Sequence, residues 1–322
     1  MANQGKYRFT DEKITTEVLA FTRYLKGERF AAATVEMYGN YVGYFLNWQQ
    51  GGSTTYQELL RFVGHCKRDG YVTKRINMML TSLRHYFSYK GVTPNPAEGL
   101  RVRGEVKQVI GEVLSSSELE ALYRDYEVYD DRSYRNKVMV GFYVYQGLTT
   151  DELQRLQVSD IDLRSGVVKV NVSSKSAHHR VGQCRSLSLR VEQVIDLQGY
   201  LLEVRPRILR ALSSGVRAGQ PSRKPDKIDW KVIEHQLFMS MHGSSVMKSS
   251  VRFMLDDLRK LNRSVRDAVH LRSSVIANWL REHDIRVVQY MAGHLSISST
   301  ERYRSADLSA LEQALKRCHP LG

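Results

Sequence analysis

Apolar residues recur at intervals of three and four through most of this chain, and this is the spacing of one face of an amphipathic helix. In the first hundred residues the pattern covers four segments, 13–27, 33–49, 55–69 and 73–90. Asn95-Pro96 then ends the helical region, because proline and the residue before it resist continuation of a helix. The N-terminal part of the chain is therefore predicted to be a small helical bundle.

The rest of the chain mixes helical and strand patterns. Ser115 and Glu118 have the spacing of a capping box, which predicts a helix from there to about Tyr126. Residues 166–173 and 183–189 have strand character and bracket a basic turn, so we expect a small β-hairpin. The remaining helical patterns lie at about 134–146, from Thr149 onward, and throughout the chain beyond 189 except for a partial loop within 204–230.

A length of 322 residues suits two domains, because about 150 residues per domain is usual. The expected fold class is mainly α-helical, with a small β-hairpin or sheet in the second domain. We predict a helical domain over 1–105, a basic linker over 106–112 and a second domain over 113–322 that ends in a helix.

The charge of the chain limits its partner. Forty-eight Lys and Arg stand against 34 Asp and Glu, a net charge of +14, with an isoelectric point near 9.6. Residues 1–110 hold 16 Lys and Arg and 9 Asp and Glu, a net of +7, which leaves +7 for the rest. Such a chain attracts polyanions and repels cationic surfaces, so nucleic acid is the leading candidate.

The sequence disfavours a secreted protein and a membrane-spanning protein. The N-terminus MANQGKYRFTDEK has no apolar core for a signal peptide, and no segment approaches the roughly 18 apolar residues of a membrane span. Cys66, Cys184 and Cys318 are far apart and lack the spacing of metal ligands, so we expect reduced thiols without a role. The expected location is the cytoplasm.

Basic and aromatic residues interleave in the segment 73–90. Lys74, Arg75 and Arg84 lie away from its apolar stripe, as a face that contacts a phosphate backbone requires. The alternative is a face that is merely solvated.

Three residues in the last third of the chain are suited to phosphodiester chemistry. Arg272 stands on a helix of apolar pattern, His294 follows Gly293, and Tyr303 comes nine residues after His294. An arginine can bind a phosphate, and a phenol can attack it. Taken singly, each has a structural alternative: a surface arginine, a helix terminator after glycine, and one of 18 tyrosines.

Four motifs of the second domain, in this order and spacing, resemble those of the tyrosine site-specific recombinases, the phage integrase and Xer class. They are GLTTDELQRLQVSDIDL at 147–163, SSKSAHHR from 173, HLRSSVIANWL from 270 and GHLSISSTERY at 293–303. The N-terminal helices with their NPAEGL ending are similar to the core-binding domain of that family. The resemblance covers nearly the whole chain and implies a DNA-binding domain followed by a catalytic domain.

The resemblance also implies a role for each matching residue. Tyr303 would attack a DNA phosphate to give a 3′-phosphotyrosine and a free 5′-hydroxyl, with neither metal nor cofactor. Arg272 would bind the phosphate, and His294 would donate a hydrogen bond to it or orient it. Lys175, at the hairpin turn, would protonate the departing 5′ oxygen, and Arg180 would contact phosphate. A hairpin lysine is otherwise usually a surface residue.

The sequence departs from the family pattern at two positions. The first arginine of the family is replaced by Thr149, which instead forms a plausible capping box with Glu152. Loss of such a donor costs about 3 to 4 kcal/mol in comparable sites unless another cation substitutes. The general-base position holds Val269, and His270 is one residue late, a rotation of about 100° within a helix. The nearby candidates for a substitute cation are Lys137, Arg135 and Arg155.

The resemblance thus predicts a recombinase that closes on double-stranded DNA as a C-shaped clamp. Four protomers would act on paired sites through a Holliday junction, in integration, excision or inversion of a mobile element. The C-terminal segment 306–317 would pack on a neighbouring protomer, or fold back on its own domain. One alternative is a DNA-binding accessory or regulatory protein of the same fold with impaired catalysis. The other is a type IB topoisomerase, which fits the domain order less well.

Overall fold

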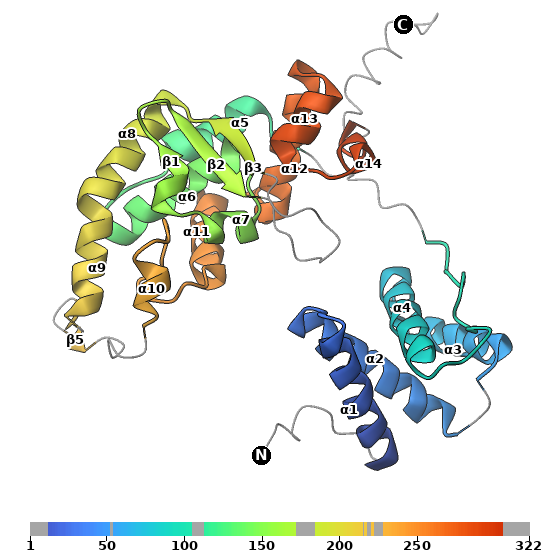
Figure 1. Cartoon of the computed structure of the whole chain (residues 1–322). Coiled ribbons are helices and arrows are strands. Elements are labelled where there is room, and N and C mark those ends of the chain that lie inside the picture. The colour runs from blue at the N-terminus through green and yellow to red at the C-terminus, as the bar shows by residue number, and fades with distance from the viewer. Residues whose placement is uncertain are drawn as a thin grey trace, which may run out of the picture. The chain divides into compact units, whose positions relative to one another are not determined.

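The computed structural model describes residues 12–51, 54–104, 113–171, 184–214, 216–217, 220–221 and 228–304. The described residues form two compact units, one up to residue 104 and one from residue 113 (Figure 1). The hairpin turn, with Lys175 and Arg180, and the predicted C-terminal helix 306–317 lie outside the described residues.

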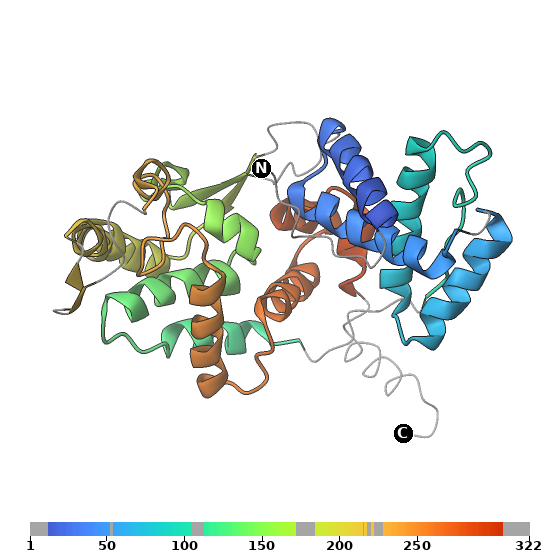
Figure 2. The same ribbon diagram turned by 90° about the horizontal axis from the view of Figure 1, so that it is seen from below.

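The first unit consists of helices, drawn in blue to teal in Figure 2. They are α1 (Glu12–Gly27), α2 (Ala32–Gln49), α3 (Tyr56–Arg68) and α4 (Thr73–Tyr89). All four predicted helices are confirmed to within a residue or two, because their apolar faces meet in one core. At its centre the rings of Phe62 and Phe87 each pack edge-on against Phe45. The bundle is therefore held mainly by apolar burial.

The second unit is built around α6 (Asp131–Val144), most of whose residues are buried. The helix begins earlier than predicted because the Asp130 side chain caps it in a box with Ser133. The capping box predicted at Ser115 is present at the start of α5 (Ser116–Arg124), and that of Thr149 starts α7 (Thr150–Arg155). The remaining helices of this unit are η1 (Val158–Asp160), α8 (Val191–Gly199), η2 (Tyr200–Val204), α9 (Arg205–Ser213), α10 (Trp230–Ile233), α11 (Lys248–Leu261), α12 (Ala268–Glu282), α13 (Ile285–Ala292) and α14 (Ile297–Glu301).

The predicted hairpin strands are present as β2 (Val167–Asn171) and β3 (Cys184–Ser188), which pair antiparallel. β1 (Ile161–Asp162) adds a third antiparallel strand in the order β1-β2-β3. The sequence pattern missed β1 and the ladder of β4 (Val216–Arg217) with β5 (Gln220–Pro221), because two residues are too few to show alternation. The predicted fold class, mainly helical with a small sheet in the second part, is confirmed.

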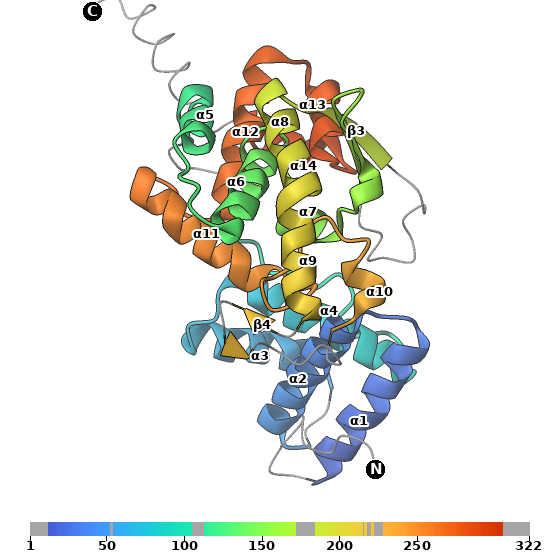
Figure 3. The same ribbon diagram turned by 90° about the vertical axis from the view of Figure 1, so that its left-hand side faces the viewer.

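Helices enclose the core of the second unit. α8 continues through η2 into α9, as Figure 3 shows in yellow, which turns part of the predicted loop 204–230 into helix. α12 packs on α5 and α6 and carries its buried face into the same core. No described helix is long and apolar enough to cross a membrane.

Candidate active site

Arg272 lies in the second turn of α12 and ties three elements together. Its Nη1 donates to the carbonyl of Gly147, after the end of α6, and its Nη2 donates to the carbonyl of Ala292 at 2.6 Å. Burial lowers the pKa of Arg272, Glu152 raises it, and Arg185 lowers it again. Arg272 is thus a fixed, largely buried cation with little freedom to change its direction.

The chain turns sharply at Gly293, where α13 ends. Gly293 has φ +68° in the left-handed region, and the amide of His294 donates to the Gln289 carbonyl at 3.0 Å. A Cβ at Gly293 would lie 2.5 Å from Nη1 of Arg185. Glycine is therefore required here for its conformation and for the close approach of Arg185. The pair Gly293-His294 does end a helix, and the same turn brings His294 to Arg272.

His294 is held at both ring nitrogens. Nε2 lies 3.3 Å from Nη2 of Arg272, and Nδ1 lies 2.8 Å from Oγ1 of Thr300. Because a guanidinium only donates, Nε2 accepts, and the proton of a neutral ring is assigned to Nδ1, which donates to Thr300. Burial, followed by the charges of Arg272 and Arg185, lowers the pKa of His294 to about 4. The imidazole is therefore neutral near pH 7.

Tyr303 lies against His294, just after α14. The two rings stack with centroids 5.8 Å apart and an interplanar angle of 13°. The Tyr303 ring also packs on a small cluster of Ile276, Val288 and Ala292, and its amide donates to the Thr300 carbonyl at 3.0 Å. Three residues that the sequence singled out, Arg272, His294 and Tyr303, thus lie at one place.

A buried ion pair, which the sequence analysis did not identify, adjoins this group. Nη1 of Arg185 donates to Oε1 of Glu152 at 2.6 Å, and Arg185 is 2% exposed. The other carboxylate oxygen, Oε2, lies 3.8 Å from Nη1 of Arg272. It also accepts from both the amide and the hydroxyl of Thr149, each at 2.9 Å. One carboxylate therefore joins Arg185, Arg272 and Thr149.

Electrostatics keep this carboxylate ionised. Burial alone would raise the pKa of Glu152, but the hydrogen bond and charge of Arg185, with help from the Thr149 amide and Arg272, hold it below its ordinary value. The alternating pattern of β3 could have indicated that Arg185 is buried, because positions 185 and 187 both face inward. An arginine at an inward position of a strand requires a buried partner. The identity of that partner required the fold.

The remaining predicted residues lie elsewhere or in other roles. Arg135 is buried and donates to the carbonyl of Met239 at 2.8 Å, and Arg155 is exposed and donates to the Asp151 carbonyl at 3.0 Å. His270 lies in the first turn of α12, not in a loop, and its Nδ1 accepts from the Arg266 amide at 3.4 Å. Its side chain is therefore turned about the helix axis by about 100° from the general-base position of the family, which Val269 occupies.

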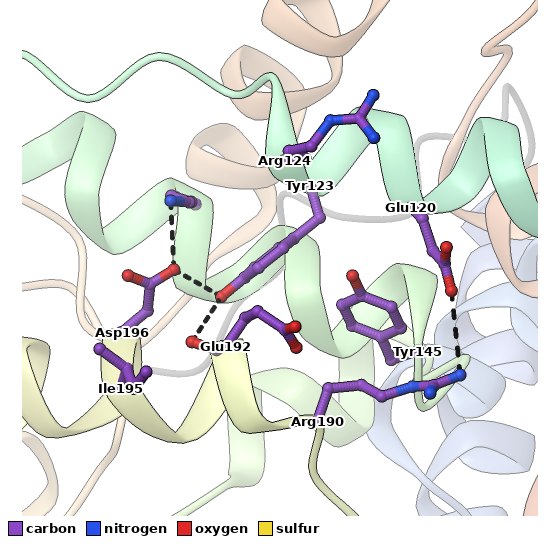
Figure 4. Close-up of a pocket in the computed structure, with 9 residues that line it drawn as sticks. Glu120, Tyr123, Arg124, Tyr145, Arg190, Glu192, Ile195 and Asp196 are labelled. Carbon is purple, nitrogen blue, oxygen red and sulfur yellow. Dashed lines mark hydrogen bonds and ion pairs between the residues drawn. The ribbon is translucent and has the colours of Figure 1, made fainter.

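Lys137 lines a separate cavity of about 450 Å³ between α5, α6 and α8. Its Nζ lies 3.2 Å from a carboxylate oxygen of Asp196, which also accepts from the hydroxyl of Tyr123 at 2.6 Å. Figure 4 shows Tyr123 with Asp196, and Arg190 reaching toward Glu120 beside Tyr145. None of the residues around Arg272 lines this cavity.

The basic face predicted on α4 is partly used within its own unit. The guanidinium of Arg75 lies 4.5 Å from the ring centre of Tyr71, whereas Arg84 donates to the Ala97 carbonyl at 3.4 Å. Arg84 also lies 3.7 Å from a carboxylate oxygen of Glu98. Lys74 is exposed. Arg84 therefore helps to hold the segment after α4, while Lys74 and Arg75 remain accessible.

Residues 112–309, more than half of the chain, match the family described as Phage integrase family. The chain belongs to the phage integrase family. It is thereby a member of the tyrosine site-specific recombinases, the enzyme class that its four motifs predicted. Tyrosine recombinase XerA of Pyrococcus furiosus is 25% identical over 316 residues, which cover 97% of each chain. Tyrosine recombinase XerD of Pseudomonas aeruginosa is 26% identical over 301 residues, 90% of this chain and 92% of the relative.

Solved structures share the fold of this family member. The XerH site-specific recombinase, in a post-cleavage complex with a palindromic difH substrate, has a TM-score of 0.63 at 17% identity. That match covers 97% of this chain and 90% of the XerH chain. The Tn1549 transposon integrase, in complex with transposon right end DNA, has a TM-score of 0.60 at 14% identity and covers 94% of this chain and 99% of its own.

Proposed function

We propose that this family member cleaves and rejoins double-stranded DNA at specific sites, with Tyr303 as the nucleophile. The observation that carries the proposal is the grouping of Arg272, His294 and Tyr303, in which the phenol ring stacks on the imidazole that contacts the largely buried guanidinium of Arg272. The net charge of +14 is of the sign that attracts DNA.

In the proposed reaction the phenol oxygen of Tyr303 loses its proton and attacks the phosphorus of one phosphodiester. A bond forms between phosphorus and the tyrosine oxygen while the bond to the 5′ oxygen breaks, and that oxygen takes up a proton. The products are a 3′-phosphotyrosine and a free 5′-hydroxyl. The reverse attack by a 5′-hydroxyl rejoins DNA, because the phosphoester bond to the protein retains the energy of the bond that broke.

The assigned roles follow the chemistry of each side chain. Arg272 binds the phosphate and meets the negative charge that grows as phosphorus becomes five-coordinate. His294 orients the phosphate, and its neutral ring adds no charge near pH 7. Lys175 donates the proton to the 5′ oxygen, Arg180 contacts phosphate, and His270 is the candidate base. The roles of Lys175, Arg180 and His270 rest on the family motif alone, and α12 turns His270 by about 100° from the family position.

The proposal extends to assembly on DNA. Lys74 and Arg75 on α4 contact the phosphate backbone, and four protomers join two recombination sites through a Holliday junction. The two units meet DNA independently, since each part of the chain carries a positive charge of its own. A catalytic domain alone would then bind more weakly than the full chain.

A nicked suicide substrate tests the central step. The protein is incubated with DNA that flanks its own gene. The cleaved strand is nicked shortly beyond the cleavage site, so that the short fragment with the free 5′-hydroxyl diffuses away and the covalent complex is trapped. Wild-type protein is expected to form a DNA adduct that survives denaturation. Tyr303→Phe removes only the nucleophilic oxygen, so DNA binding is expected to persist while the adduct disappears. An adduct with Tyr303→Phe would place the nucleophile elsewhere.

A second candidate function is supported by Thr149. Its side chain caps α7 and binds Glu152, which is a structural role and supplies no positive charge. A recombinase-fold protein with impaired cleavage could serve as an accessory or regulatory DNA-binding factor. Binding of specific DNA by the wild type, without any adduct on nicked substrates, would favour this alternative.

A further inference from the structure

Arg185 stands where its strand would normally carry an apolar side chain. It faces inward from β3, opposite Val170 of β2 and two residues before the buried Leu187. A buried guanidinium is costly unless its charge and donors are matched. Arg185 meets this condition only in part: Glu152 matches its charge and accepts from Nη1, and the Met291 carbonyl accepts from Nε at 2.9 Å, but its buried Nη2 has no hydrogen-bond partner among the described residues. The cost of this arrangement suggests a purpose beyond filling the core.

Arg185 lies near the two residues that bind and orient the phosphate in the proposed function, Arg272 and His294. Met291 precedes Ala292, whose carbonyl accepts from Arg272, and Arg185 lies against Gly293 immediately before His294. The charge of Arg185 acts on both Arg272 and His294. Arg185 therefore contacts the turn that places these groups.

The charges around Glu152 show what Arg185 contributes. Glu152 lies between two guanidinium groups, 2.6 Å from Arg185 and 3.8 Å from Arg272. With both arginines present, one carboxylate and two cations leave a net charge of +1 beside His294. Without Arg185, the carboxylate would have only Arg272 as a charged partner among these groups, and the net charge would be zero. A phosphodiester, which is an anion, is attracted by the net positive charge of the first arrangement and gains no net attraction from the second.

We propose that Arg185 is a positioning residue for DNA cleavage: it neutralises and holds Glu152, so that Arg272 keeps its positive charge for the scissile phosphate. This need is acute here because Thr149 supplies no second cation. The inference rests on the proposed cleavage by Tyr303, and it assigns to Arg185 the compensation that sequence reasoning sought at Lys137, Arg135 or Arg155.

A double-mutant cycle tests the proposal through the charge itself. Single-turnover cleavage is measured at saturating DNA for Arg185→Met, Glu152→Gln and the variant that carries both. Arg185→Met is expected to slow cleavage by about 10²- to 10³-fold, the loss typical of one preorganised donor. Glu152→Gln should remain within about tenfold of wild type. The double variant should recover to within about tenfold as well, because Arg272 is again uncompensated.

A matched control separates this effect from general loss of stability. Arg205 is a buried arginine of the same unit that donates to the carbonyls of Ile233, Glu234 and Gln236. Arg205→Met is expected to lower the unfolding temperature but to leave cleavage unchanged at a temperature where the variant is folded. If Arg205→Met slows cleavage as much as Arg185→Met, or if the double variant stays as slow as Arg185→Met, the proposal is overturned.

A second readout does not depend on cleavage. The pKa of His294 is followed by nuclear magnetic resonance in each folded variant without DNA. Arg185→Met is expected to raise that pKa, because one repelling charge is lost and Glu152 now compensates Arg272. The double variant is expected to lower it again. An unchanged His294 pKa in Arg185→Met would overturn the proposal, whether or not the wild-type protein cleaves DNA. Absence of cleavage by the wild-type protein would by itself refute only the proposed function.

Discussion

The capping box of α7 is expected to serve both the fold and the active site, and Thr149→Ala tests this. The substitution removes the hydroxyl that holds Oε2 of Glu152 and accepts from the Glu152 amide. Loss of an N-cap costs about 0.5 to 2 kcal/mol of unfolding free energy. Oε2, now less restrained, can move toward Nη1 of Arg272, from 3.8 Å to an ion-pair distance of about 2.8 Å.

The size of the second effect follows from Coulomb's law. At an effective dielectric constant of about 20, the attraction between unit charges is about 4.4 kcal/mol at 3.8 Å and about 5.9 kcal/mol at 2.8 Å. The difference, about 1.5 kcal/mol, adds to the free-energy cost of replacing the carboxylate by the phosphate as the ion-pair partner of Arg272. We therefore expect Thr149→Ala to slow single-turnover cleavage by about tenfold, since about 1.4 kcal/mol corresponds to a factor of ten.

Ser115→Ala is the matched control, because Ser115 forms the same capping box with Glu118 at the start of α5. Both variants are compared by urea unfolding and by cleavage of a nicked substrate at saturating DNA. Both should lose similar stability, and only Thr149→Ala should lose cleavage. If the two variants cleave at the same rate, the hold of Thr149 on Glu152 has no part in the reaction.

Three further predictions concern charge. If six to ten phosphates are neutralised, the affinity for DNA should fall by about 10³ to 10⁵ between about 50 and 200 mM salt. A DNA affinity that barely changes with salt would contradict an interface dominated by phosphate contacts. His294 takes up a proton near pH 6.5 in the unfolded chain but only near pH 4 in the folded protein, so the unfolded state binds more protons between these two pH values. The unfolding free energy should therefore fall as the pH drops from 6.5 to 4. His294→Asn should flatten that part of a denaturation series, and an unaltered slope would count against the buried, neutral ring. Thr149→Arg should leave cleavage unchanged or reduce it, because it breaks the capping box with Glu152, whose charge Arg185 already neutralises. A steep increase in adduct formation would favour the impaired accessory protein.

Local patterns predicted much of the fold because local forces determine it. The helical intervals found the bundle and α6, and the Ser115 and Thr149 boxes were readable because all their atoms lie within four residues. The alternation of Val168 and Val170 likewise indicated β2. Segments of two residues, such as β1, carry no period and were missed.

The site divides in the same way. Gly293-His294 and Tyr303 could be placed together because they are close in sequence and joined by one short helix, α14. The ion pair of Arg185 and Glu152 joins residues 33 positions apart, and nothing in either local pattern names the other. Its relation to Arg272 depends on the packing of β3, α7 and α12, so only the fold could identify it.

The phenol oxygen of Tyr303 is expected to be the atom that becomes joined to DNA. Peptide mapping of the trapped adduct tests this most directly. The adduct is digested with protease and nuclease, and the modified peptide is sequenced by mass spectrometry. The account predicts a nucleotide joined through its 3′-phosphate to Tyr303, in the peptide that follows Gly293-His294. A 5′-phosphate linkage, or a modified residue other than Tyr303, would contradict it.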